Sequence, residues 1–140
     1  MVGRPRYVDV NVFIYWLGGH PVYGEKAREW IRRIEKASPR EYVTSTLTVY
    51  ETLVILAGLM GQTLKNTEFV EGIVGVFGGL RGLVLEPLKI EDFLWAVELM
   101  GEYGLDYEDS LHLAVALRTG SAAVITNDKD WDKAPIPRVF

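Results

Sequence analysis

Four carboxylates in the sequence stand at predicted strand ends or in the opening turns of predicted helices. Asp9 closes a short β-prone run, Asp128 follows another, and Glu51 and Asp109 lie near the starts of two apolar helices. Brought together without a counter-charge, such groups would repel and some would take up protons, whereas one or two divalent cations would make the cluster favourable. The chain has no cysteine and two histidines. A metal would therefore be held mainly by oxygen, as Mg²⁺ and Mn²⁺ prefer.

Each of these acids also has a purely structural explanation. Glu51 stands three residues after a threonine, which is the spacing of a capping box. Asp106 and Asp109 suit the first turn of a helix, and Asp128 suits the cap of a turn. Asp9 is harder to explain in this way, because acids are depleted in strands and are rarely buried without a partner. Taken singly, the residues leave capping and metal binding both open.

Short apolar strands alternate with helices along the chain. Strands are predicted near 7–9, 42–44, 83–87, 122–126 and 139–140, and helices over 11–17, 23–37, 45–60, 66–80, 90–103 and 104–117, with a single turn at 128–131. This alternation predicts an α/β fold, a three-layer α/β/α sandwich with a mainly parallel central sheet, formed as one domain over 1–140. Ligands of such sheets bind beyond the carboxyl ends of the strands, where all four acids are expected.

Two of the predicted helices have unusual surfaces. The helix over 45–60 is apolar around most of its circumference, which predicts that the core or a partner buries it. Four glycines interrupt the helix over 66–80, and they favour close helix contact or a loose end. Both helices suit a partner surface or a homodimer.

Composition limits the class of protein. With 140 residues, 49% of them apolar, the chain is long enough to bury a core. Its net charge of −4 argues against a protein that holds nucleic acid by bulk charge, so metal ions would have to supply positive charge at a phosphate. Asp9 interrupts any N-terminal signal-peptide pattern, and the longest uncharged apolar run, 72–80, is too short to span a bilayer. We expect a cytoplasmic protein with no membrane contact.

Taken together, four motifs resemble the PIN-domain superfamily, and especially its small VapC-type ribonuclease toxins. The motifs are the run 7–12 (Tyr-Val-Asp-Val-Asn-Val), Tyr50 with Glu51, the run 109–116 (Asp-Ser-Leu-His-Leu-Ala-Val-Ala) and the run 126–130 (Thr-Asn-Asp-Lys-Asp). They occur in the family's order and span nearly the whole chain. Each motif is weak alone, but the set is fairly specific.

The resemblance implies an acidic quartet that holds Mg²⁺ or Mn²⁺ and supports catalysis. Its members would be Asp9, Glu51, Asp109 and Asp128. The implied activity is that of a metal-dependent endoribonuclease, which hydrolyses RNA phosphodiester bonds with water activated by metal ions. Mg²⁺ keeps several of its waters, so some of the quartet would act through water.

Other polar residues near the quartet would support or compete with it. Asn11, Thr126 and Asp130 match the supporting positions of the family. Asp106 competes with Asp109 for the third acidic position, and Asp130 competes with Asp128 for the fourth. Asp109 is preferred because the Ser-Leu-His-Leu-Ala run follows it directly.

Several other residues are functional candidates. His112 lies between apolar neighbours, which is more typical of a hydrogen-bonded histidine beside the core than of a catalytic one. Trp131 is interpreted as a packing residue. Arg4 and Arg6 are the candidates for contact with substrate, because they precede the strand that carries Asp9.

The resemblance implies a toxin that is held by a small antitoxin, whose basic side chain would enter the acidic pocket. The homodimer is expected from the two helices over 45–60 and 66–80. One alternative is a non-catalytic module that binds such a basic segment, and another is an RNA-processing nuclease that is not a toxin. A phosphatase with an aspartyl nucleophile is disfavoured, because it would need an acid two residues after Asp9, where the chain has Asn11.

Overall fold

The computed structural model describes residues 3–140. Strands and helices follow one another in the order β1 (Arg6–Val8), α1 (Val10–Leu17), α2 (Gly24–Lys36), β2 (Tyr42–Ser45), α3 (Thr46–Met60), α4 (Thr67–Gly78), β3 (Leu83–Glu86), α5 (Ile90–Tyr103), α6 (Tyr107–Arg118), β4 (Ala123–Ile125), the short 3₁₀ helix η1 (Lys129–Lys133) and β5 (Arg138–Val139). The termini of the main elements lie within a few residues of the predicted ones.

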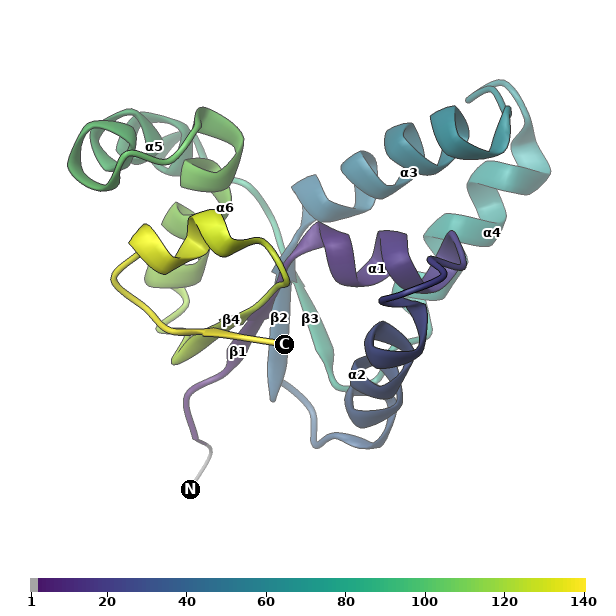
Figure 1. The fold of residues 1–140 in the computed structure, drawn as a ribbon, viewed down its shortest axis with the longest axis horizontal. Helices are drawn as coiled ribbons and strands as arrows, with labels where there is room; N and C mark the ends of the chain where they lie inside the picture. The colour runs from purple at the N-terminus through teal and green to yellow at the C-terminus, as the bar shows by residue number, and fades with distance from the viewer. Residues whose placement is uncertain (1–2) are drawn as a thin grey trace.

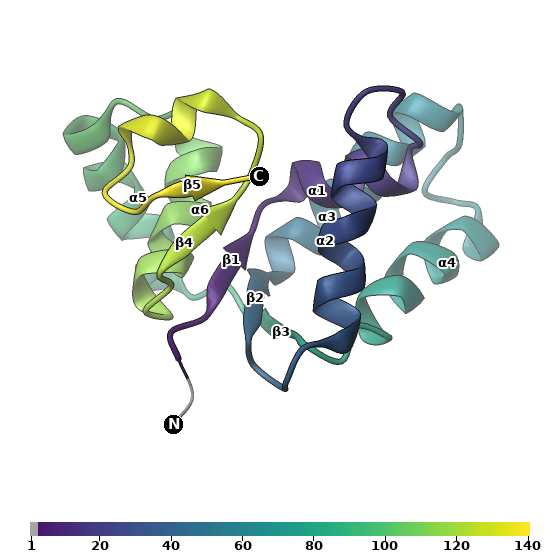
Figure 2. The same ribbon diagram turned by 60° about the horizontal axis from the view of Figure 1, so that its bottom comes forward.

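The five strands form one sheet in the order β3-β2-β1-β4-β5, and every neighbouring pair is parallel (Figure 2). The strand β1 lies in the middle, where Tyr7 pairs with Val43 of β2 and Val124 of β4. All strands therefore end at the same edge of the sheet. The predicted parallel sheet is confirmed.

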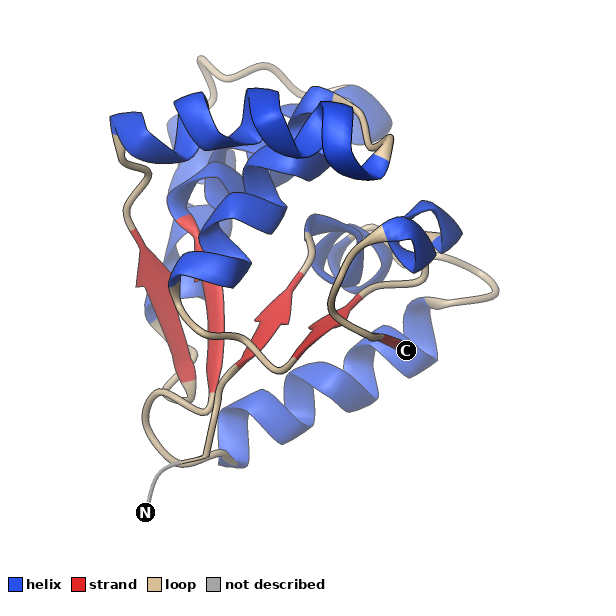
Figure 3. Ribbon diagram, turned by 90° about the vertical axis from the view of Figure 1, so that its left-hand side faces the viewer, coloured by secondary structure: helices blue, strands red, loops and turns tan. Residues whose placement is uncertain are grey.

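Side chains of the central strands alternate between two apolar cores, one on each face of the sheet. Val8, Tyr42 and Ile125 pack with the buried face of α2 and with Phe77 of α4. Their neighbours in the strands, Tyr7, Val43 and Val124, pack instead with α5 and α6. Helices consequently cover both faces of the sheet (Figures 1 and 3), which confirms the three-layer sandwich.

The helices α3 and α4 differ from their predicted surroundings. One side of α3 is buried through Leu53, Leu56 and Ala57, while its other side exposes apolar residues, including Leu59 at 67%. The described chain therefore covers only one side of this helix. Of the two alternatives predicted for the α4 glycines, close helix contact is wrong, because a Cβ atom placed on Gly72, Gly75 or Gly78 would meet nothing within 4 Å.

The helix α6 packs against both the sheet and α5. Gly104 ends α5 with a φ of 71°, a left-handed conformation that favours glycine, and the chain then turns into α6. Every α6 residue from 110 to 116 is buried. At its end, Arg118 donates hydrogen bonds to Asp92 of α5 and Glu86 of β3. Within residues 3–140, no helix combines the length and apolar character needed to cross a membrane.

Candidate active site

Asp9 lies at the carboxyl edge of the sheet, directly after β1, and only 4% of it is exposed. Thr126, which follows β4, donates a hydrogen bond to Asp9 Oδ2 over 2.8 Å, and Asn11 Nδ2 donates to Thr126 Oγ1 over 2.9 Å. Burial raises the pKa of Asp9, although the charge of His112 and the Thr126 hydrogen bond oppose this effect. A buried acid is thus fixed in orientation by two polar residues from separate elements.

A second set of acids, which we call the aspartate group, consists of Asp109, Asp128 and Asp130. One carboxylate oxygen from each lies within 4.8 Å of the others. Burial raises the pKa of Asp109 to about 7, and the negative charges of Asp106, Asp9 and Asp128 add to this rise. The group therefore concentrates negative charge next to Asp9.

Helix caps also help to position Asp109 and Asp128, two members of the aspartate group. Asp106 Oδ1 accepts a hydrogen bond from the Asp109 backbone N–H over 2.8 Å, so capping explains Asp106. Asp128 Oδ1 accepts from the Asp130 backbone N–H over 2.9 Å at the start of η1. This cap engages one oxygen of Asp128, and capping and metal binding are therefore compatible at this residue.

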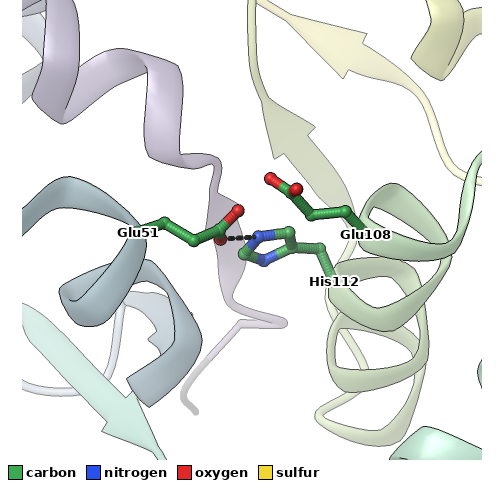
Figure 4. Close-up of side chains that lie close together, drawn as sticks. All are labelled: Glu51, Glu108 and His112. Carbon is green, nitrogen blue, oxygen red and sulfur yellow. Dashed lines mark hydrogen bonds and ion pairs between the residues drawn. The ribbon is translucent and has the colours of Figure 1, made fainter. Parts of the chain in front are cut away.

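The glutamate–histidine group consists of Glu51 on α3 and of Glu108 and His112 on α6 (Figure 4). His112 is 1% exposed, and its Nε2 donates to Glu51 Oε1 over 2.5 Å. Burial raises the pKa of Glu51, but the hydrogen bond from His112, together with the nearby Glu108 side chain, outweighs burial and lowers it. In turn, the adjacent Glu51 carboxylate, together with burial, raises the pKa of Glu108 to about 8.

The capping-box explanation of Glu51 is wrong. The helix α3 begins at Thr46 with Ser45 as its N-cap, so Glu51 lies in the second turn and caps nothing. The threonine three residues before it is inside the helix and accepts a hydrogen bond from Thr44 Oγ1. Burial of Glu51, which is 9% exposed, therefore has no explanation in the ends of its own helix.

The four predicted acids lie along one edge of the sheet but do not form a single cluster. Asp109 and Asp128 are together in the aspartate group, whereas Glu51 belongs to the glutamate–histidine group. Among the described residues, Asp9 belongs to neither group of ligand atoms, but it is electrostatically coupled to both. The charge of Asp9 raises the pKa of Asp109, and the charge of Glu51 raises the pKa of Asp9. Asp9 therefore interacts electrostatically with members of both groups.

The sequence interpretation missed Glu108 and the link between His112 and Glu51. His112 was expected to be a hydrogen-bonded residue beside the core, and the structure agrees on that point. A usable signal was present, because residues four apart on a helix share a face and Glu108 precedes His112 by four. Asp106 and Asp109, which lie close to Glu108 in the sequence, were the candidates for the acidic position.

The two arginines proposed for substrate contact lie in different places. Arg4 donates hydrogen bonds to the carbonyls of Gly120 and Ser121, just before β4. Since the strands are parallel, this is the amino edge of the sheet, opposite the acids. Arg6 lines a cavity of about 540 Å³ whose remaining lining residues are Lys26, Glu29, Trp30, Arg33, Val139 and Phe140. Trp131 is fully buried, which confirms its packing role.

The donors at this edge suit a hard divalent cation. They are carboxylate oxygens and one imidazole, without sulfur, and Mg²⁺ or Mn²⁺ binds such sets. Glu51 Oε2 is buried and has no hydrogen-bond partner in the described chain. A cation would satisfy this oxygen and would offset the repulsion that raises the pKa of Asp109.

Comparison with known proteins identifies the family and the fold. A model of the PIN domain matches residues 6–137. No curated protein matches the chain. Similar solved structures include a toxin–antitoxin complex from Klebsiella pneumoniae, with 22% identity, 96% of each chain covered and a TM-score of 0.63.

Two further structures extend the fold comparison. VapC20 from Mycobacterium tuberculosis, a toxin that cleaves the sarcin-ricin loop, shares 16% identity over 95% of this chain and 97% of its own, with a TM-score of 0.73. VapBC2 from Rickettsia felis, bound to a DNA fragment from their promoter, shares 16% identity over 96% of both chains, with a TM-score of 0.67.

Proposed function

Because the chain belongs to the PIN-domain family, we propose that it is a divalent-metal-dependent endoribonuclease that hydrolyses RNA phosphodiester bonds. The observation that carries this proposal is the concentration of acids around Asp9 at the carboxyl edge of the sheet. None of the salt bridges among the described residues involves Asp109, Asp128 or Asp130. Such an arrangement is costly unless it serves to bind positive charge.

The residues proposed to hold Mg²⁺ or Mn²⁺ are Asp9, Glu51, Asp109 and Asp128. The chemistry that a bound cation supplies is neutralisation of the attacked phosphate and acidification of water. Thr126 and Asn11 fix Asp9 for this task through their hydrogen bonds. Asp130 adds a third carboxylate to the aspartate group at its exposed side.

The direct test compares the wild type with Asp9→Asn in an RNA cleavage assay. Wild-type protein should cut single-stranded RNA in Mg²⁺ or Mn²⁺ and stop when EDTA is added. Asp9→Asn should keep the wild-type circular dichroism spectrum and lose cleavage, because it removes the central charge of the site. Undiminished cleavage by this variant, or by wild type in EDTA, would exclude the proposed mechanism.

We further propose that the enzyme is the toxin of a toxin–antitoxin pair and acts in the cytoplasm. Support comes from the solved structures of similar fold, which include a toxin–antitoxin complex. The partner would be a small antitoxin that presents a basic side chain to the acids. Expression of wild type and Asp9→Asn in one bacterial host tests this role, with growth arrest expected only for wild type. Unimpaired growth with active enzyme would favour an RNA-processing nuclease instead.

A homodimer is proposed because the described chain leaves an apolar face of α3 open. Val54, Ile55, Leu59 and Met60 are each at least 38% exposed on this helix. Light scattering after size exclusion should give twice the chain mass for wild type. Leu59→Lys should shift the protein toward the monomer mass, and Val22→Lys, which changes an equally exposed residue outside α3, should not.

The cavity beside Arg6 is the proposed contact for the RNA backbone. It is lined by three cations, Arg6, Lys26 and Arg33, against one acidic side chain, Glu29. Arg33→Gln should raise the KM for RNA by roughly threefold to tenfold and reduce the salt dependence of binding, since each phosphate contact releases counterions. Arg4→Gln is the matched control, because Arg4 does not line this cavity and donates instead to the carbonyls of Gly120 and Ser121. Equal effects of both substitutions would exclude this contact.

A non-catalytic module is the second candidate. The exposed acids Glu108 and Asp130 widen the negative surface, which would also accept a lysine or arginine of a partner. Calorimetry separates the two functions. A module of this kind would bind a basic peptide without binding Mn²⁺ and without cutting RNA.

A further inference from the structure

Both ring nitrogens of the buried His112 are engaged by neighbours that lie far away in the sequence. The Tyr7 hydroxyl contacts Nδ1 over 2.6 Å, and Glu51 Oε1 contacts Nε2 over 2.5 Å. Tyr7 comes from the central strand β1, His112 from α6 and Glu51 from α3. These three side chains form a continuous path from the core of the sheet to its carboxyl edge.

The proton positions along this path are set by its ends. If the Tyr7 hydroxyl donates to Nδ1, the ring is neutral and carries its proton on Nε2. If the ring is protonated, Nδ1 donates to the Tyr7 oxygen and Nε2 again carries a proton. In both cases Nε2 donates to Glu51 Oε1. One oxygen of the Glu51 carboxylate is therefore occupied by His112.

The other oxygen of Glu51 is left free by this arrangement. Glu51 Oε2 is buried and has no hydrogen-bond partner among the described residues. Figure 4 shows the Glu51 carboxylate turned toward Glu108, with the His112 ring alongside. His112 thus fixes a rotamer that leaves an unpaired carboxylate oxygen at the edge where the other acids lie.

We propose that His112 is a positioning residue for Glu51, that Tyr7 in turn orients His112, and that together they direct Glu51 Oε2 to a divalent cation. The inference rests on the proposed function, since it assigns Glu51 to the metal site. It adds two residues to that site which the acidic quartet does not contain. Neither residue touches the cation or the RNA.

A purely structural role explains these residues less well. Fully buried polar groups stabilise a core less than apolar groups of similar volume, because the polar groups must first lose water. His112 and Tyr7 are at most 1% exposed, and Tyr7 belongs to the apolar core that includes Leu113 to Ala116 of α6. Moreover, a network that served only packing would have no reason to leave a buried oxygen of Glu51 unpaired.

Titration with Mn²⁺ alone tests the inference without RNA. His112→Leu keeps an apolar side chain of similar size in the core and removes the donor. Its affinity for Mn²⁺, measured by calorimetry, should fall by about 10–100-fold, the range typical for residues that orient metal ligands. Tyr7→Phe keeps the aromatic ring and should weaken binding less. His112→Gln can place an amide N–H near the Nε2 position, so it should recover most of the affinity.

Thr52→Val is the matched control. Thr52 is fully buried one residue from Glu51 on α3, and its hydroxyl donates only to the Thr48 carbonyl. This variant should lower the melting temperature without changing the Mn²⁺ affinity. A loss of affinity in Thr52→Val equal to that in His112→Leu would show that the effect is structural, which would overturn the inference.

The remaining outcomes separate this inference from the proposed function. If wild type neither binds Mn²⁺ nor cuts RNA, the proposed function fails. If wild type does both, and the Tyr7 and His112 variants bind Mn²⁺ as tightly as wild type, the inference alone fails. If His112→Leu does not fold, the Mn²⁺ affinities of Tyr7→Phe and Thr52→Val are compared instead. Weaker binding in Tyr7→Phe alone would support the positioning role, and unchanged binding in Tyr7→Phe would contradict it.

Discussion

The aspartate group and the glutamate–histidine group place similar charges in different surroundings. Asp109, Asp128 and Asp130 are half-buried or exposed, and their described neighbours include other acids and no hydrogen-bonded cationic side chain. In the second group, buried Glu51 has a hydrogen-bonded histidine that lowers its pKa below the usual range, after burial has raised it. The protein thus stabilises one carboxylate internally, whereas no described cationic side chain is hydrogen-bonded to the aspartate group.

Substitution of Asp109 should produce the largest loss of activity. Asp109→Asn removes a charge from the centre of the aspartate group and should lower RNA cleavage by more than about 100-fold, beyond the effect usual for residues that only orient ligands. Asp106→Asn is the control, because asparagine caps a helix as well as aspartate does. Cleavage assays at saturating Mn²⁺ would separate them. Similar activity in both variants would exclude a role of the Asp109 side chain in cleavage.

When metal is absent, removal of a charge should change the melting temperature in opposite directions for the two groups. In EDTA, Asp109→Asn should raise the melting temperature, because it relieves repulsion from Asp9 and Asp128. Glu51→Leu should lower it by the equivalent of about 1–3 kcal/mol, since His112 would lose its buried partner. Differential scanning calorimetry gives both shifts. Shifts of the same sign would contradict the contrast between the groups.

A smaller effect is expected in the pH dependence of stability. The pKa of Asp109 is about 7 in the folded protein, above its ordinary value of 3.8, so the folded state holds this proton more tightly than the unfolded state. The contribution of Asp109 to stability should therefore fall as the pH rises from about 4 to about 7. In EDTA, the difference in melting temperature between Asp109→Asn and wild type should widen over this range. A constant difference would mean that Asp109 is ionised throughout.

Much of the fold followed from the sequence because its signals are local. The alternation of apolar strands and helices predicted the parallel sheet, and the direction of the sheet placed Asp9, Asp109 and Asp128 at one edge. The same reasoning, applied to Arg4, would have placed it at the opposite edge, as the structure does. That the chain forms a single domain over 1–140 stays a prediction.

The parts that could not be predicted depend on side-chain contacts between distant elements. Nothing local to Glu51 shows that it faces His112, sixty-one residues later. The glycines of α4 gave a misleading signal, because the open space around Gly72 and Gly75 reflects an uncovered surface and not a close helix contact. Assignment of the four acids to a metal also stays a prediction, since a charge cluster alone does not identify the ion that binds it.

The pairing of β1 with β4 has a consequence for the order in which the protein is made. Asp9 receives its hydrogen bond from Thr126, 117 residues later, and β1 completes its place in the sheet only when Ala123–Ile125 arrives. Parallel strands this far apart in sequence pair late in folding. On a ribosome, the acids at the sheet edge would therefore assemble only after β4 and Thr126 have emerged.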